Sequence, residues 1–461
     1  MDTCRRAPVS IWRRIVRGSR PACPSRRVLD PEAANSRKLF AIAQSPDAIS
    51  SAPPPCRITA PRRKGRKLVA EAYARDRKCP LDGVRVLDLS RLVAGNMLTH
   101  VLADLGADVI KVEPPEGDSL RAWKLNGISV QWKVYGRNKR SIVIDLKKDE
   151  DRDIFRKLVA SSHILVENFR PGVLDRLGFD MGELLKLQPK LVVARISGWG
   201  KTGPYRDKPG FGTLVEAASG FAFKNGFPDR EPLLPNLGLA DSVAGLYGAS
   251  AVLVALREAE LGAGKGQEID LSLLEPIISI LGADQAVHKA TGAVPTRTGN
   301  RTALSAPRNI YCTSDAGYVA LSASTPEMAY RLFRSIGRAE LCDDPRFVTN
   351  EKRVENVEEL DAIIGDFIGG LTLAENLAHF DKAEVTVGPI YDAVALMEDA
   401  HVRARGTFVE MEDAEMGTLP MHAVVGRLSA TPGAIRRPAP MLDEHRSELL
   451  DELYAGQALT M

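Results

Sequence analysis

The chain has 461 residues, 44% of them hydrophobic, which is enough to bury a large core spread over more than one domain. No stretch approaches 18 apolar residues without a charge, so we expect no transmembrane helix. The net charge of +3 conceals an asymmetry, because residues 1–80 hold 19 of the 62 lysines and arginines but only 6 of the 59 acidic residues. The rest of the chain is mildly acidic, which gives no reason to expect nucleic-acid binding.

Residues 1–80 have the composition of an extension rather than of a folded domain. They lack sustained hydrophobic periodicity and contain three prolines at 53–55 and a basic run at 62–67. We expect a basic, disordered segment. Its composition is typical of a transit peptide, which would imply a mitochondrial location, and also of a start codon assigned too far upstream, which would imply a cytoplasmic one. The six cysteines form no C-x-x-C pair, which fits a reducing compartment.

From Cys79 onward, apolar runs of strand length alternate with helical patterns. A strand at 84–89 is followed by a helix at 95–105 and a strand at 107–113. Further strands are expected at 141–145, 163–167, 191–197 and 267–271. Because strands that alternate with helices pair in parallel, the sequence predicts an α/β fold with a Rossmann-like parallel sheet.

The turn after the first strand does not favour a dinucleotide-binding enzyme. Glu113 ends the second strand, where an acid that binds a ribose would lie. The turn at 90–96, however, holds one glycine and no G-x-G-x-x-G sequence. An NAD enzyme is therefore a weak alternative.

Basic residues gather near several predicted strand ends in an otherwise acidic body. They are Lys139, Arg140, Lys147, Arg170 and Arg176. One interpretation is a solvated charged face. The other is a site for a phosphate-rich ligand such as a nucleotide or coenzyme A, since ligands bind at the carboxyl edge of an open α/β sheet.

After residue 285 the alternation of strands and helices weakens. The sequence predicts a hairpin of two strands, at 309–313 and 318–322. Three helices are expected after it, at 326–337, 357–369 and 372–381. Two more strands and a closing helix are expected at 406–412, 417–425 and 443–453. We therefore predict a large Rossmann-like domain at 81–285, a smaller α+β domain at 286–390, and a C-terminal segment at 391–461 that returns to the large domain.

Asp241 lies where a long helix rich in alanine, leucine and valine is predicted to begin, at Asp241-Ser242. An acid there is either an N-cap that accepts hydrogen bonds from free amides or an ionised carboxylate offered as a nucleophile. The seven histidines form no H-E-x-x-H pattern or other metal-ligand spacing, and no G-x-S-x-G sequence occurs. A carboxylate nucleophile needs neither a base nor a metal, because it is ionised at neutral pH.

An ordered set of short sequences, from about residue 80 to 450, resembles the family III CoA-transferases, also called the CaiB/BaiF family. The matching stretches are 81–89 (LDGVRVLDL), 106–115 (GADVIKVEPP), 138–141 (NKRS), 166–172 (VENFRPG), 198–204 (GWGKTGP), 239–242 (LADS), 264–267 (GKGQ), 343–347 (DDPRF) and 388–389 (GP). Each stretch is short, but their order along the chain is specific to the family.

The resemblance implies transfer of CoA from an acyl-CoA to a carboxylic acid through a covalent aspartyl-CoA thioester on Asp241. It also implies CoA contacts at Val93, Ala94, Ile144, Asp145, Leu146, Lys147, Asn168, Phe169, Arg170 and Arg176. CoA would be a substrate, with no tightly bound cofactor and no metal. The partners implied are acyl-CoA and small carboxylic acids, and the assembly implied is an interlocked homodimer.

Some positions depart from the family pattern. Val93 stands where a glutamine can occur, Asn96 where a proline is frequent, and Gly212 where Asp or Tyr is frequent. Residues 290–310 lack a clear glycine-rich run like the mobile loop of the formyl-CoA enzyme.

Two other functions remain open. A 2-methylacyl-CoA racemase shares the fold, but the position of its histidine is occupied here by Phe211, so one proton-transfer group is missing. A CoA-binding protein without catalytic activity is the second alternative, and it would not need Asp241.

Overall fold

The computed structural model describes residues 73–458. The predictions for residues 1–72 lie outside these described residues. Residues 73–80, which we assigned to the extension, contact the C-terminal segment: the Tyr73 hydroxyl donates to the carbonyl of Glu412, and the Ala74 amide donates to the carbonyl of Ile435.

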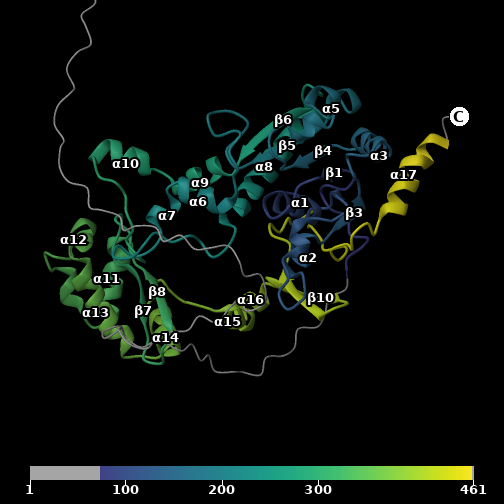
Figure 1. Ribbon diagram of the computed structural model, residues 1–461. Coiled ribbons are helices and arrows are strands. Elements are labelled where there is room, and N and C mark those ends of the chain that lie inside the picture. Colours follow the sequence, from purple (N-terminus) through teal and green to yellow (C-terminus); the bar gives the residue numbers. More distant parts are fainter. Residues whose placement is uncertain (1–72, 459–461) are drawn as a thin grey trace, which may run out of the picture. The chain divides into compact units, whose positions relative to one another are not determined.

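The centre of the fold is a parallel sheet of six strands in the order β3-β2-β1-β4-β5-β6 (Figure 1). The strands are β1 (Arg85–Asp88), β2 (Asp108–Glu113), β3 (Lys139–Val143), β4 (Ile164–Glu167), β5 (Val192–Ser197) and β6 (Gln267–Ser272). The predicted fold class is thereby confirmed. The strand order reverses between β1 and β4, and in open α/β sheets such a reversal is where ligands bind.

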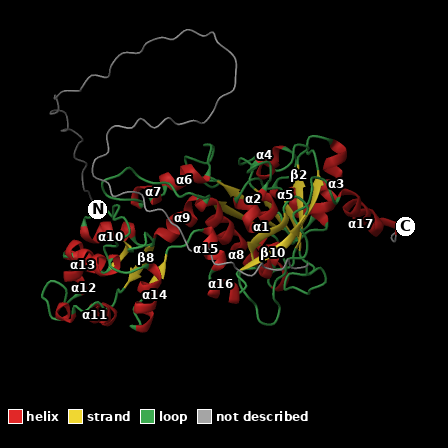
Figure 2. Ribbon diagram, turned by 90° about the horizontal axis from the view of Figure 1, so that it is seen from below, coloured by secondary structure: helices red, strands yellow, loops and turns green. Residues whose placement is uncertain are grey.

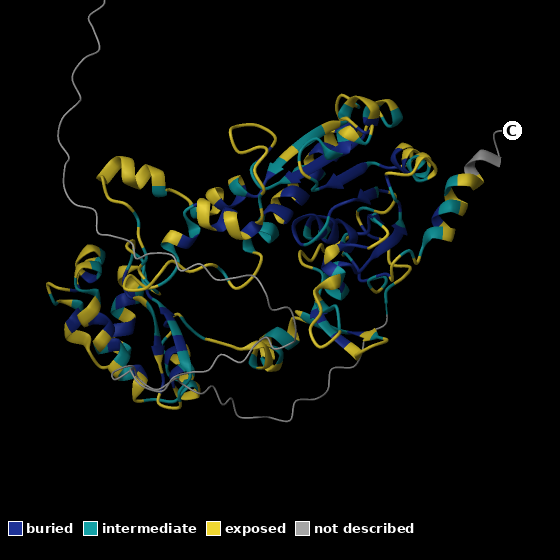
Figure 3. Ribbon diagram, viewed as in Figure 1, coloured by how far each residue is buried: buried dark blue, intermediate teal, exposed yellow. Residues whose placement is uncertain are grey.

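Alternate residues of the strands enter two separate cores, one on each face of the sheet. Val86 and Val166 pack with α1 and α8 on one face, while Leu87 and Leu165 pack with α3 and α5 on the other. Figures 2 and 3 show the helices around the sheet and the burial of its strands. The helices of this region are α1 (Ala94–Asp104), α2 (Val130–Tyr135), α3 (Asp149–Ala160), α4 (Val173–Arg176), α5 (Met181–Leu187), α6 (Gly212–Ala218), α7 (Phe221–Lys224), α8 (Leu239–Leu261), α9 (Leu274–Leu281) and α10 (Asp284–Thr291). Side chains that alternate between two cores produce the near-continuous apolar strands seen in the sequence.

Helix α8 is long and apolar enough to meet the length and composition of a membrane span, which we did not expect from the sequence. One side of the helix is packed inside the protein. A Cβ atom at Gly245 would collide with the backbone of Ala94 and with Met97, and one at Gly248 would collide with Leu98. The two glycines therefore allow α8 to lie close against α1, as in a core helix.

A cluster of buried charges lies under the turn between β1 and α1. The Lys111 ammonium lies 3.1 Å from Oδ1 of Asp88 and 2.8 Å from Oδ2 of Asp118, and the Lys139 ammonium lies 3.0 Å from Oδ2 of Asp88. Burial by itself raises the pKa of Asp88, but the two lysines outweigh it and hold this pKa below its usual range. Burial lowers the pKa of Lys139 to about 8. We call Asp88, Lys111, Asp118 and Lys139 the buried charge cluster.

Residues 308–389 contain a second, three-stranded sheet in the order β7-β8-β9. Its strands and neighbouring helices are β7 (Arg308–Cys312), β8 (Tyr318–Ser322), β9 (Val387–Pro389), α11 (Pro326–Ser335), α12 (Asn350–Glu355), α13 (Val357–Gly369) and α14 (Leu373–Lys382). Phe333, Phe347 and Phe380 belong to a hydrophobic core of its own. This part has the α+β character expected from the sequence.

The C-terminal segment contacts the edge of the large sheet. The Val143 amide donates to Oδ1 of Asp443 (2.7 Å), and Arg446 donates to the carbonyl of Val143 (2.6 Å). The segment comprises α15 (Ala393–Glu398), α16 (Ala400–Ala404), β10 (Phe408–Asp413), β11 (Gly417–His422) and α17 (Arg446–Ala458). Backbone groups at the open edge of β3 are thus paired within the chain.

Replacing Lys111 by methionine should destabilise the fold strongly, because Asp88 and Asp118 would lose the ammonium between them. Removing one partner of a buried ion pair costs about 3–5 kcal/mol. Chemical denaturation would measure the loss, with Lys124→Met, at an exposed loop position, as the control. A variant as stable as the wild type would show that the cluster contributes nothing to folding.

Candidate active site

A cavity of about 710 Å³ opens at the carboxyl ends of β1 to β5. Nine of the residues expected to act in catalysis or CoA binding line it: Ala94, Ile144, Asp145, Leu146, Lys147, Asn168, Phe169, Arg176 and Asp241. They come from five separate stretches of sequence. Since the cavity lies where the strand order reverses, it occupies the usual ligand position of a doubly wound sheet, and its size suits a small molecule or cofactor.

Two of the expected contacts lie outside this cavity. Val93 is buried at the start of α1, and Arg170 lines an adjoining pocket of about 150 Å³ that shares Asn168 and Phe169 with the main cavity. Both are neighbours in sequence of residues that line the main cavity.

The expected cluster of five basic residues is only partly correct. Lys139 and Arg140 begin β3, so they lie at the amino end of the sheet rather than at the cavity. Lys139 is in the buried charge cluster, and Arg140 pairs with Asp108 and two C-terminal glutamates. The cations that line the cavity are Arg91, Lys147 and Arg176. These three are the groups available to phosphate oxygens.

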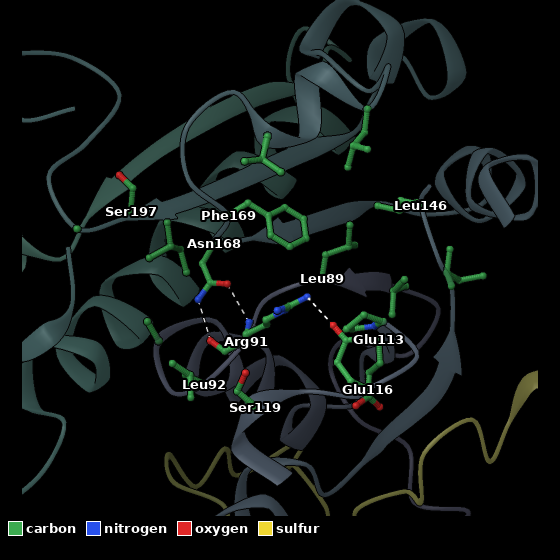
Figure 4. Close-up of a pocket in the computed structure, with 18 of the residues that line it drawn as sticks. Leu89, Arg91, Leu92, Glu113, Glu116, Ser119, Leu146, Asn168, Phe169 and Ser197 are labelled. Atoms are coloured by element: carbon green, nitrogen blue, oxygen red, sulfur yellow. Dashed lines mark hydrogen bonds and ion pairs between the residues drawn. The ribbon is translucent and has the colours of Figure 1, made fainter. Parts of the chain in front are cut away.

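The loops around the cavity hold one another in place. The Asn168 side-chain oxygen accepts from the Arg91 amide, and its nitrogen donates to the Arg91 carbonyl, both at 2.8 Å (Figure 4). Next to Arg91, the Leu92 amide donates to Oδ1 of Asp118 (3.0 Å). The buried charge cluster therefore fixes the turn after β1, and that turn is tied to the turn after β4.

Glu113 lines the cavity but is fully engaged inside the protein. Its two carboxylate oxygens accept from the Arg121 guanidinium at 2.7 Å, from the Ser141 hydroxyl and from the Asp118 amide. A ribose hydroxyl would have to displace these bonds. The structure thus gives no support to the NAD alternative.

Asp241 lies in the first turn of α8, but it is not the residue that caps this helix. The helix begins at Leu239 and its N-cap is Gly238, two residues before the start expected from the sequence. Among residues 73–458, no group donates a hydrogen bond to the Asp241 carboxylate. Burial and the nearby Glu216 raise its pKa to about 6. Of the two interpretations offered by the sequence, the one in which Asp241 is the N-cap is wrong. The group is still mainly ionised at neutral pH.

The side chain of Asp241 lies against Gly212, the first residue of α6. A Cβ atom at this position would overlap Oδ2 of Asp241. Gly198, Gly210 and Phe211 line the cavity beside it. The carboxylate is therefore partly buried, free of hydrogen-bond donors from the described residues, and open to a ligand in the cavity.

Sequence reasoning missed Glu216 and the contact with Gly212. Glu216 is 3% exposed and its Oε1 accepts from the Ala240 amide at 3.0 Å. The sequence signal that could have identified Glu216 was an acidic residue next to Val215, on the side of a short apolar helix that is buried. An acid at such a position is uncommon unless it is paired.

Residues 81–446 match the family model described as CoA-transferase family III. The chain belongs to CoA-transferase family III. The resemblance seen in the sequence is thereby confirmed, and the enzyme class with it.

Relatives and a solved structure agree with the family assignment. Succinyl-CoA–D-citramalate CoA-transferase of Chloroflexus aurantiacus is 39% identical, over 81% of this chain and 94% of the relative. The succinyl-CoA–L-malate CoA-transferase beta subunit of the same organism is 36% identical, over 81% and 94%. The crystal structure of a CAIB/BAIF family protein from Brucella suis matches with a TM-score of 0.73 and 33% identity, covering 82% of this chain and all of that one.

Replacing Gly212 by alanine should lower the activity of this family III CoA-transferase without unfolding it. The new methyl group would push the Asp241 carboxylate aside, and a misplacement of about 1 Å can reduce the rate roughly 100-fold. Steady-state kinetics and denaturation midpoints would measure both effects. Gly365→Ala in α13, where a Cβ atom makes only ordinary contact, is the control. Unchanged kinetics would mean that the position of Asp241 is unimportant.

Proposed function

We propose that the enzyme transfers CoA from an acyl-CoA donor to a carboxylic acid through a covalent aspartyl-CoA thioester on Asp241. The observation that carries this proposal is the position of Asp241. Its carboxylate borders the same cavity as the residues expected to contact CoA, and no described residue donates a hydrogen bond to it. A carboxylate nucleophile must be partly removed from water and must have an oxygen that is not engaged in hydrogen bonds. The Asp241 carboxylate meets both conditions among the described residues.

The reaction would proceed through four displacements that need no external acid or base. The Asp241 carboxylate attacks the acyl carbonyl of the donor, which forms a mixed anhydride and expels the CoA thiolate. The thiolate attacks the aspartyl carbonyl and releases the donor acid as a carboxylate. The acceptor carboxylate then attacks the aspartyl thioester, forming a second anhydride and releasing thiolate again. Attack of this thiolate on the acceptor carbonyl yields the new acyl-CoA and restores Asp241.

We further propose that donor and acceptor are short dicarboxylic acids and their CoA thioesters. The names of two relatives support this, since they describe transfer from succinyl-CoA to citramalate and to malate. Arg91, Lys147 and Arg176 are the cavity cations available to anionic groups of such substrates and of CoA.

Intact mass spectrometry after incubation with a panel of acyl-CoAs tests the covalent step. We expect a mass gain equal to attached CoA with the wild type and none with Asp241→Asn. Asp229→Asn, at an exposed loop position, should behave as the wild type. If no donor produces an adduct and a 2-methylacyl-CoA instead exchanges its α-hydrogen with solvent deuterium, racemase chemistry replaces this proposal.

We also propose that two copies of the chain form a homodimer. Several large apolar side chains on the outer side of α8 are exposed, among them Leu246 (51%), Tyr247 (45%) and Val254 (70%). Such a contiguous apolar stripe is typical of a protein interface. Sedimentation should give twice the mass of the chain, and Val254→Glu should shift the protein toward the monomer. A monomeric wild type at micromolar concentration would refute the dimer.

A further inference from the structure

The first turn of α8 is capped by an acid from another helix. Gly238, the N-cap residue, has no side chain to offer. The amide of Ala240 instead donates to Oε1 of Glu216 in α6, at 3.0 Å. The first backbone amides of a helix have no hydrogen-bond acceptor within the helix. The Glu216 carboxylate accepts from one of these amides, as the side chain of an N-cap residue normally does. Glu216 therefore holds the turn that carries Asp241.

The same helix provides the surface on which the Asp241 carboxylate lies. Gly212 and Glu216 are four residues apart, so they share one side of α6. Gly212 contacts the carboxylate and Glu216 binds the neighbouring amide. Gly238, where a Cβ atom would lie 3.4 Å from Oδ2 of Asp241, carries no charge. Among the described residues, Glu216 is the charged group that acts on Asp241.

We propose that Glu216 is a positioning residue that holds the first turn of α8 and, through its negative charge, favours the acylated form of Asp241 over the free carboxylate. The proposal rests on Asp241 as the nucleophile. Glu216 binds the amide of the residue before Asp241, and a like charge disfavours the ionised form of a neighbouring carboxyl group. When Asp241 attacks an acyl-CoA, its charge leaves with the CoA thiolate, and the anhydride and the thioester are both neutral. The repulsion by Glu216 is thus present only while Asp241 is a free carboxylate.

The pH dependence of the reaction follows from the same repulsion. Burial and Glu216 raise the pKa of Asp241 to about 6. Only the ionised carboxylate is nucleophilic. The value of kcat/KM should therefore be maximal above the pKa of Asp241 and fall as the pH decreases through this pKa, which gives the pH profile an acid limb. Removing the charge of Glu216 should move this acid limb to lower pH and leave its shape unchanged.

The variant Glu216→Gln separates charge from structure, because a glutamine oxygen can still accept the hydrogen bond from Ala240. We expect the acid limb to shift by roughly 0.5–1 pH unit and the equilibrium amount of aspartyl-CoA adduct to fall roughly 3- to 10-fold. The denaturation midpoint should stay near that of the wild type. Glu260→Gln, at an exposed position of α8, is the matched control and should change nothing.

A second variant keeps the test decisive if the glutamine perturbs folding. Glu216→Ala should lower the denaturation midpoint, because the cap is lost, and should show the same shift of the acid limb. An unmoved limb and an unchanged adduct level in both variants would overturn the proposed role of Glu216, while the wild-type adduct would still support Asp241. A wild type that forms no adduct with any donor would overturn both proposals.

Discussion

The ion pairing of Asp88 with Lys111 and Lys139 is the interaction on which the site depends. Two ammonium groups and two carboxylates lie out of water in the same cluster, and any one left alone would carry a large desolvation penalty. The strands β1, β2 and β3 must therefore meet in one arrangement. That arrangement fixes the turn after β1, whose backbone faces the cavity, before any ligand is present.

The molecule uses aspartates in two opposite electrostatic settings. Asp88 is buried beside two lysines, which outweigh its burial and hold its pKa below the usual range. Asp241 has burial and a second acid beside it, and its pKa is raised. Asp88 is suited to a structural role, because the ion pairs with the two lysines favour its charged form. Asp241 is suited to the proposed chemistry, because a destabilised carboxylate would gain from giving up its charge to a leaving thiolate.

The site also depends on segments far apart along the chain. The turn after β4 is tied to the turn after β1 by Asn168 and Arg91, and the edge of β3 is closed by residues 443–446. These contacts leave the carboxyl edge of the sheet open while its outer strand is covered. The cavity is therefore a product of the whole large sheet rather than of one loop.

The sequence by itself determined the alternating strands and helices, the parallel sheet, the enzyme family and nine of the residues that line the cavity. It could do so because apolar periodicity sets element type, and because residues that follow parallel strands meet at one edge. Only the tertiary structure placed Lys139 in the core rather than at a phosphate, began α8 at Leu239, and set Glu216 beside Asp241. Charge pairing and burial depend on which helices meet, and that information is not present in the spacing of residues along one chain.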